Sequence, residues 1–317
     1  KYPEARKKID SLSAQYPTLG AGPLGEALIY QALMFENYDY RYEKQYMQAS
    51  EAAQSQLEKG LKEQDNLALK YFFLAGIQAL DAIHSMRKTE YLPAINKAVE
   101  AMKSLEKVRE LAPTLPDLKL GDGMYLYWRS RISLSSKALP DFKDQRSEGI
   151  ALMLQAEVSS YYLGPGASMA LAYSYIEEHQ LKLALDRCLY MRKSYPDNVI
   201  NNMTLARIYT SMRRYEDALR IYEEVKRTSD SNQKVYYQEG VVYSRMGRYT
   251  DAEKAFLTYV GFAEIPEDAL SSTQYRLGMV YSHLKNPEEA RKWYEASVKT
   301  NGNKAAKKAL EKMDEKQ

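Results

Sequence analysis

The feature that most constrains this chain is a set of four residue columns that recur at an almost constant spacing. Four segments, beginning at Pro165, Val199, Gln233 and Ser271, each contain a small residue, a tyrosine three places on, an alanine twelve places on and a larger side chain sixteen places on. The columns are Ala172, Ala206, Gly240 and Gly278; Tyr175, Tyr209, Tyr243 and Tyr281; Ala184, Ala218, Ala252 and Ala290; and Cys188, Tyr222, Phe256 and Tyr294. Successive small residues are 34, 34 and 38 positions apart. This regularity predicts four consecutive structural repeats over residues 165–302.

A period of 34 residues is that of two antiparallel helices, which bury their apolar faces only by stacking on neighbouring pairs. We expect the small residues where the two helices pass closest, because a leucine at Gly240 would overpack the contact at a cost of about 1–3 kcal/mol. The aromatic columns are expected to fill the core, each side chain contributing about 1.5–3 kcal/mol when buried. The four extra residues of the last step fall in the 261–269 connection, where Pro266 suits a longer loop.

This arrangement resembles the tetratricopeptide repeat family. Leucine precedes the small residue in three of the four segments, and Pro196 closes the first repeat as it does in the family. Two positions depart from the pattern: Glu239 stands in place of the leucine in the third repeat, and Asn301–Gly302 stands where the last repeat would end in proline. The resemblance implies a right-handed α-solenoid of helical hairpins that binds other proteins.

The rest of the chain is predicted to form helix pairs without a clean register. Apolar residues with helical spacing and the positions of the prolines indicate helices over the following ranges, with Pro140 dividing the last pair: 3–16; 24–36 and 40–62; 66–86 and 91–111; 117–136 and 142–161. We expect one continuous all-α solenoid, with degenerate hairpins over 1–163, four repeats over 164–302 and a polar capping helix over 303–317. Gly20–Gly25 formally matches G-x-G-x-x-G, but it follows a helix and not a strand, so we interpret it as a helix–helix loop and not a nucleotide site.

Few residues suggest catalysis. His84, His179 and His283 lie on separate hairpins, with no metal-ligand spacing and no nucleophile placed beside them on the same element. The single cysteine, Cys188, occupies a core column and is interpreted as a buried structural thiol. We therefore expect no enzyme activity, no metal and no cofactor, although carboxylates brought together by folding remain an open alternative.

The family resemblance implies a binding surface on the first helix of each repeat. Carried over position by position, it predicts the partner-binding residues Met169, Tyr173, Met203, Arg207, Ser211, Lys234, Tyr237, Arg245, Tyr275 and Met279, with Val241 and His283 in the same face. Tyrosine, methionine and arginine are residues that protein interfaces favour. The alternative is that some of them pack between repeats. The lysine–asparagine carboxylate clamp of chaperone-binding family members is absent, because Met169 and Tyr173 occupy its positions.

The expected partner is another protein or peptide, with Arg207 and Arg245 fixing acidic groups. Nucleic acid is disfavoured, since 45 basic and 42 acidic residues leave a net charge of only +3. RNA stacking on the 28 tyrosines remains a remote alternative. No apolar run is long enough to span a bilayer. A further alternative is docking into a cell-envelope assembly through the outer face or the N-terminal hairpins, including Trp128.

The compartment and the oligomeric state stay open. The numbering starts at Lys1 without methionine, which suits a processed or trimmed chain, so a signal peptide or lipid anchor before it would not be visible. One cysteine suits a bacterial cytosol or periplasm. Gly121–Trp128 resembles the N-terminal halves of exported bacterial members of the family, which favours a periplasmic or envelope location.

Overall fold

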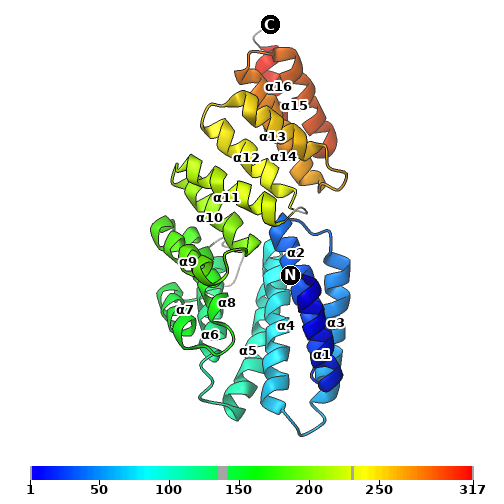
Figure 1. Ribbon diagram of the computed structural model, residues 1–317, viewed down its shortest axis with the longest axis vertical. Helices are drawn as coiled ribbons and strands as arrows, with labels where there is room; N and C mark the ends of the chain where they lie inside the picture. The colour runs from blue at the N-terminus through cyan, green and yellow to red at the C-terminus, as the bar shows by residue number, and fades with distance from the viewer. Residues whose placement is uncertain (1, 135–140, 230–231, 316–317) are drawn as a thin grey trace. The chain divides into compact units, whose positions relative to one another are not determined.

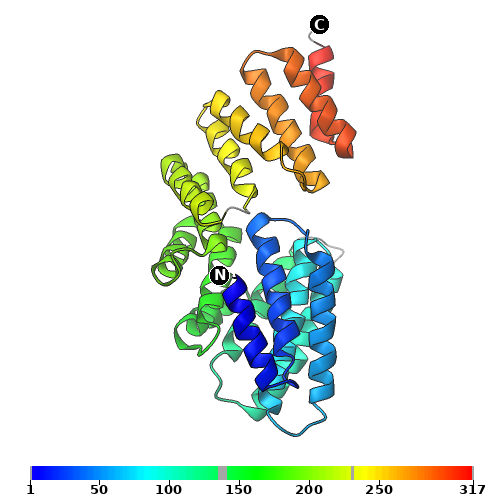
Figure 2. The same cartoon turned by 45° about the vertical axis from the view of Figure 1, so that its right-hand side comes forward.

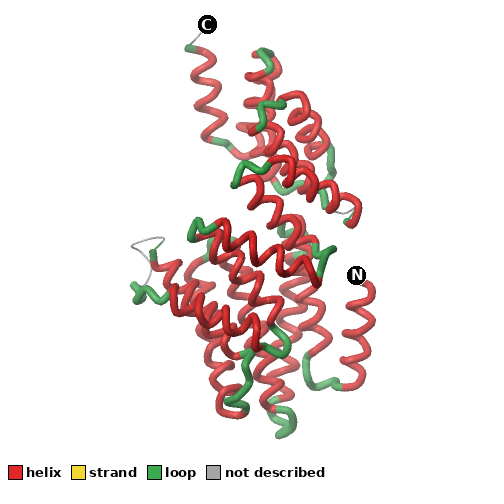
Figure 3. Tube along the Cα trace, turned by 60° about the vertical axis from the view of Figure 1, so that its left-hand side comes forward, coloured by secondary structure: helices red, strands yellow, loops and turns green. Residues whose placement is uncertain are grey.

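The computed structural model describes residues 2–134, 141–229 and 232–315, and the described residues are almost entirely helical (Figure 1). They form sixteen α-helices, and no strand occurs among them (Figure 3). The all-α prediction is therefore confirmed. The expected break at Pro140 lies outside the described residues. The chain divides into two compact units, which are taken in turn.

The first unit contains Lys1–Phe35 and Arg41–Met191. Its helices run in chain order, with α2 and α9 continuing beyond the unit: α1 Tyr2–Gln15, α2 Ala21–Asn37, α3 Glu43–Gly60, α4 Leu67–Arg87, α5 Tyr91–Leu111, α6 Leu118–Ser133, α7 Arg146–Ser159, α8 Gly164–Glu177 and α9 Leu181–Ser194. The longest pair, α4 and α5, lies side by side along its length (Figure 1), and α6 packs on α7. The unit ends inside α9, whereas the sequence analysis expected a boundary between residues 163 and 164.

The second unit contains Glu36–Tyr40 and Arg192–Gln317. After the end of α9 its helices are α10 Val199–Ser211, α11 Tyr215–Thr228, α12 Lys234–Arg245, α13 Tyr249–Val260, α14 Glu267–His283, α15 Pro287–Asn301 and α16 Lys304–Asp314. The pairs α10/α11, α12/α13 and α14/α15 stack in sequence, and α16 packs on α15 (Figure 2). The short segment Glu36–Tyr40 joins this unit although residues 41–191 separate it from the rest.

The repeat columns form the core as predicted. The four column alanines, Ala184, Ala218, Ala252 and Ala290, are fully buried, and so are Tyr222 and Phe256. Cys188 is also buried, which confirms its interpretation as a structural thiol. A Cβ atom added to Gly240 would lie 2.5 Å from Phe256 Cε1, and one added to Gly278 would lie 2.5 Å from Tyr294 Cδ1. The paired helices therefore approach to a distance that leaves no room for a side chain.

Each repeat also turns between its helices in the same way. One residue per turn has a left-handed backbone: His179, Arg213, Gly247 and Lys285, with φ between 57° and 74°. In each turn the next backbone N–H donates to the carbonyl of the column tyrosine, at 2.8–3.0 Å: Gln180 to Tyr175, Arg214 to Tyr209, Arg248 to Tyr243 and Asn286 to Tyr281. This hydrogen bond satisfies a carbonyl that a helix end would leave unpaired.

The same turn occurs in the α4/α5 hairpin. Thr89 has φ 61°, and Glu90 N–H donates to Ser85 O at 2.9 Å. This pair was expected to be a degenerate repeat, and its turn follows the geometry of the regular ones. Residues 91–94, Tyr-Leu-Pro-Ala, resemble the family's turn into the second helix, and α5 begins at Tyr91.

The expectation of a loop over Gly20–Gly25 is wrong. Gly20 takes φ 61° just before α2, and residues 21–25 form the first turns of that helix. A Cβ at Gly25 would lie 2.5 Å from Ile9 Cδ1, and one at Gly22 would lie 2.6 Å from Ser13 Oγ. The glycines therefore allow α1 and α2 to pack closely. A glycine pattern alone does not distinguish a flexible loop from a close helix contact.

We expect Gly240→Ala to destabilise the protein even though alanine is the better helix former. The added methyl meets Phe256, so overpacking of about 1–3 kcal/mol outweighs a helix-propensity gain of up to about 1 kcal/mol. The control is Gly76→Ala in α4, where nothing lies within 4 Å of the added Cβ. This change should stabilise by about 0.5–1 kcal/mol. Urea unfolding of both variants measures the difference, and a stabilising Gly240→Ala would contradict the close approach.

Candidate partner-binding surface

The ten residues predicted to bind a partner lie on four helices. Met169 and Tyr173 are half-buried on α8 of the first unit. The others lie on α10, α12 and α14 of the second unit; Arg207, Ser211, Arg245 and Met279 are exposed, and Lys234, Tyr237 and Tyr275 are half-buried. Met203 is fully buried and is part of the core. Most residues of α10 are buried. The position of Met203 is therefore in the core, whereas the equivalent Tyr237 and Tyr275 are half-buried.

Two cations lie against one tyrosine in the second unit, and a third, Arg207, is close enough to repel one of them. Lys234 Nζ lies 4.0 Å from the ring centroid of Tyr237 and 5.3 Å from that of Tyr259. Arg276 Nε donates to Tyr237 Oη at 2.9 Å, so the tyrosine joins α12 to α14. We call Arg207, Lys234 and Arg276 the cationic cluster. Arg207, Lys234 and Tyr237 are among the residues predicted from the sequence; Arg276 is not, although it is adjacent to a predicted position, Tyr275.

The electrostatics of Lys234 show how concentrated this positive charge is. Burial, with repulsion from Arg276 and Arg207, lowers the pKa of Lys234 to about 8, although attraction by Asp39 opposes the shift. The ring faces of Tyr237 and Tyr259 offer the ammonium a partial replacement for water. The cluster therefore holds its positive charge at a cost, and nearby acidic groups relieve that cost.

The Glu36–Tyr40 segment lies against this surface. Asn232 Nδ2 donates to the backbone oxygen of Glu36 at 3.0 Å, in a buried position. Arg207 Nη1 donates to Tyr38 Oη at 3.3 Å, and its guanidinium carbon lies 5.2 Å from the Tyr38 ring centroid. The sequence analysis identified residues 37–39 only as a break between two helices. No sequence signal connects residues so far apart, so only folding could bring them together.

Other predicted residues make contacts within the unit. Arg245 Nη1 donates to the Thr210 carbonyl at the end of α10 at 3.3 Å. The ring of Tyr275 lies 5.7 Å from that of Tyr294. Glu239, which replaces the leucine of the repeat pattern, is also paired, because its buried carboxylate lies 2.8 Å from Lys226 Nζ. Burial raises the pKa of Glu239, and Lys226 opposes that rise.

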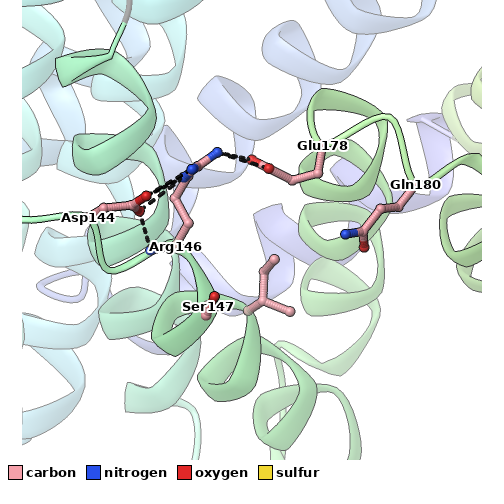
Figure 4. Close-up of a pocket in the computed structure, with 6 residues that line it drawn as sticks. Asp144, Arg146, Ser147, Glu178 and Gln180 are labelled. Atoms are coloured by element: carbon pink, nitrogen blue, oxygen red, sulfur yellow. Dashed lines mark hydrogen bonds and ion pairs between the residues drawn. The ribbon is translucent and has the colours of Figure 1, made fainter.

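A polar hollow of about 230 Å³ lies in the first unit, lined by Asp144, Arg146, Ser147, Ile150, Glu178 and Gln180. Figure 4 shows the Arg146 guanidinium between the carboxylates of Asp144 and Glu178, to which it donates at 2.8–3.2 Å. Arg146 lowers the pKa of Asp144 to about 2. Since the guanidinium is already shared by two carboxylates, the hollow is best explained as an ion-pair network that joins α7 to the α8–α9 turn.

The histidines and the cysteine occupy unrelated positions. Buried His84 bonds Glu43 at 3.0 Å, and His283 stacks on Tyr249 with ring centroids 4.3 Å apart. Burial raises the pKa of the Cys188 thiol to about 12, which makes it a poor nucleophile. Within the described ranges, no group of three histidine, cysteine or acidic side chains could hold a metal ion. No helix in the same ranges is long and apolar enough to cross a membrane.

Sequence comparison identifies the repeats directly. Family models described as tetratricopeptide repeat match residues 204–236, 233–264 and 271–304. These matches cover the three helix pairs of the second unit. A search of curated proteins finds no match.

Comparison with solved structures finds similar helical proteins at low identity. PilF of Pseudomonas aeruginosa is 11% identical, with 78% of this chain and 98% of that chain covered and a TM-score of 0.54. A monomeric mutant of IFIT1 with Gppp-AAAA is 12% identical, with 84% and 58% covered and a TM-score of 0.57. A thermophilic TPR protein of Thermus thermophilus is 16% identical, with 60% and 93% covered and a TM-score of 0.42. At such identities the likeness concerns the fold alone.

The repeat matches agree with the buried columns and the recurring turns described above. Residues 204–264 and 271–304 therefore consist of tetratricopeptide repeats.

Proposed function

We propose that this protein is a non-catalytic scaffold that binds a segment of another protein on the surface formed by α10, α12 and α14. The observation that carries the proposal is the cationic cluster, in which Arg207 already holds Tyr38 of the chain's own Glu36–Tyr40 segment. Tetratricopeptide repeats support the general role of a protein–protein interaction scaffold. This proposal adds the surface on which the partner segment binds.

The chemistry of the surface favours an acidic partner. Arg207 and Arg245 are exposed, and the arginine fork suits carboxylates. Tyr237 and Tyr275 offer rigid apolar area beside them, and exposed Met279 adds an adaptable side chain. Such a combination of arginine, tyrosine and methionine is typical of the centre of protein interfaces.

A second candidate surface lies on the first unit. Val158, Tyr161 and Tyr162 are 71–80% exposed, and the loop that carries the two tyrosines is held by buried Asp117. The Asp117 carboxylate accepts the backbone N–H groups of Tyr161, Tyr162 and Leu163, each at 2.9 Å. Rigid, exposed aromatic side chains are suited to docking. This feature favours the alternative in which an N-terminal hairpin attaches the protein to a larger assembly, such as one in the cell envelope.

Charge reversal tests the first surface. We expect Arg207→Glu combined with Arg245→Glu to weaken partner binding at least about tenfold, because an acidic partner would then meet like charge. The measurement is crosslinking capture from source cells followed by titration of the captured partner. The matched control is Arg220→Glu with Arg227→Glu, which makes the same charge change at exposed positions on α11.

If both double variants retain the partner and remain folded, the proposed surface is wrong. Tyr161→Ser with Tyr162→Ser, tested in the same way, then decides whether the first unit carries the binding. Loss of the partner in the tyrosine variant alone would favour the second candidate.

The pH dependence of stability tests whether Lys234 is buried as described. Its folded pKa of about 8 lies below the unfolded value near 10.4, so the unfolded state holds more protons between these two values. Stability therefore rises with pH in that window. Relative to Lys234→Met, the wild type should gain about 1–2 kcal/mol in free energy of unfolding between pH 7.5 and 9.5. Parallel pH profiles for the two proteins would contradict this burial.

A further inference from the structure

We propose that the Glu36–Tyr40 segment is an internal ligand of the cationic cluster, and that the partner segment has the same chemistry, a tyrosine next to a carboxylate. The inference rests on the proposed function and adds to it the class of partner and a mode of regulation. A partner would bind only by displacing the chain's own segment.

Contacts along the segment resemble those of a bound peptide. Its backbone is held at Glu36, whose carbonyl oxygen accepts from Asn232 Nδ2 at 3.0 Å. The side chain of Tyr38 is held next, by a hydrogen bond to Arg207 and by the guanidinium over its ring. One backbone contact and one side-chain contact fix both the register and the identity of the residue that faces the arginine.

Burial shows that the segment is fixed in place. Asp39 is only 2% exposed, and Glu36 and Asn37 are almost as buried, although acidic and amide side chains normally lie in water. Tyr38 has φ 53°, a left-handed conformation that is costly for a residue with a Cβ. Left-handed residues also follow the ends of α8 and α10, at His179 and Arg213, so this conformation marks the end of α2. The burial of Asp39 fixes the connection between α2 and α3 in place.

Charge explains why this sequence suits the cluster. Arg207 and Arg276 both repel the Lys234 ammonium, and Asp39 attracts it. A tyrosine ring over Arg207 adds a cation–π contact that water does not replace. An incoming segment that displaced Tyr38 and Asp39 would restore the same contacts by supplying an aromatic ring for Arg207 and a negative charge for Lys234. These contacts define the partner class.

Tethering makes the internal ligand an effective competitor. A segment in the same chain acts at an effective concentration that reaches the millimolar range. A separate peptide binds only those molecules whose surface is vacant. Its measured affinity is therefore its intrinsic affinity multiplied by the vacant fraction. Weakening the internal contact should therefore raise the affinity for an external peptide without any change to the surface.

The experiment uses the full chain and a fluorescein-labelled peptide with the sequence of residues 35–41, Phe-Glu-Asn-Tyr-Asp-Tyr-Arg. Its affinity is measured by fluorescence anisotropy for the wild type and for Tyr38→Gly with Asp39→Asn. Glycine suits the left-handed backbone at position 38, so this variant removes the ring and the charge without adding strain. Tyr195→Gly with Asp197→Asn makes the same chemical changes at an exposed turn and serves as the control.

We expect the Tyr38→Gly/Asp39→Asn variant to bind the peptide at least about tenfold more tightly than the wild type and the control. Adding Arg207→Glu to that variant should abolish the binding. A peptide with alanine for the first tyrosine and asparagine for the aspartate should bind none of the proteins measurably. Circular dichroism confirms that each variant is folded.

Equal affinity for the wild type and the double variant would overturn the inference, and so would the absence of binding to a folded double variant. These failures are distinguishable from failure of the proposed function. Partner capture that depends on Arg207 and Arg245, together with a negative peptide result, would leave the proposed surface standing and remove the internal ligand. Arginine-independent capture would instead remove the surface itself.

Discussion

The structure depends on how closely paired helices can approach at the small-residue columns. At Gly240 and Gly278 the facing aromatic ring occupies the space where a Cβ would stand. This contact sets the distance between the helices of a pair, and the aromatic side chain that fills it is itself buried. Interiors are packed densely enough that one added carbon must displace a neighbour. Because the same contact occurs in α12/α13 and α14/α15, both pairs hold their first helix at a similar distance, and α12 and α14 contribute to the proposed binding surface.

In the first unit, polar side chains also hold neighbouring helices together. Asp81 accepts hydrogen bonds from Tyr46, Ser50 and Gln54 at 2.6–3.0 Å, which join α3 to α4. Fully buried Lys70 donates to the Gly60 carbonyl at 2.7 Å and to Asp65 at 2.6 Å. A buried polar group is tolerated only when it is hydrogen-bonded, so these contacts fix the helices in one arrangement.

In the second unit, the same surface that the repeats build is contacted by a short segment from far away in the sequence. The cationic cluster and the Glu36–Tyr40 segment complement each other in charge and in aromatic character. In the proposed function, the internal segment sets the affinity that a partner has to exceed. The rigid tyrosines beside Asp117 give the first unit a separate exposed feature, which is suited to a second contact.

The sequence by itself determined the helical repeats, their register over residues 165–302 and the burial of Cys188. The repeats, their register and the burial of Cys188 follow from residue types that recur at a fixed period. The period and the residue sizes can be read from the sequence without knowledge of the tertiary contacts. The sequence also located Arg207, Lys234 and Tyr237, because their positions within a repeat place them on its first helix. The tertiary structure decided the rest. It buried Met203, because α10 is enclosed on most sides; it turned the Gly20–Gly25 pattern into the start of a packed helix; and it brought Tyr38 to Arg207. Each of these outcomes depends on which neighbour lies against a given helix face, and a spacing along one chain does not contain that information.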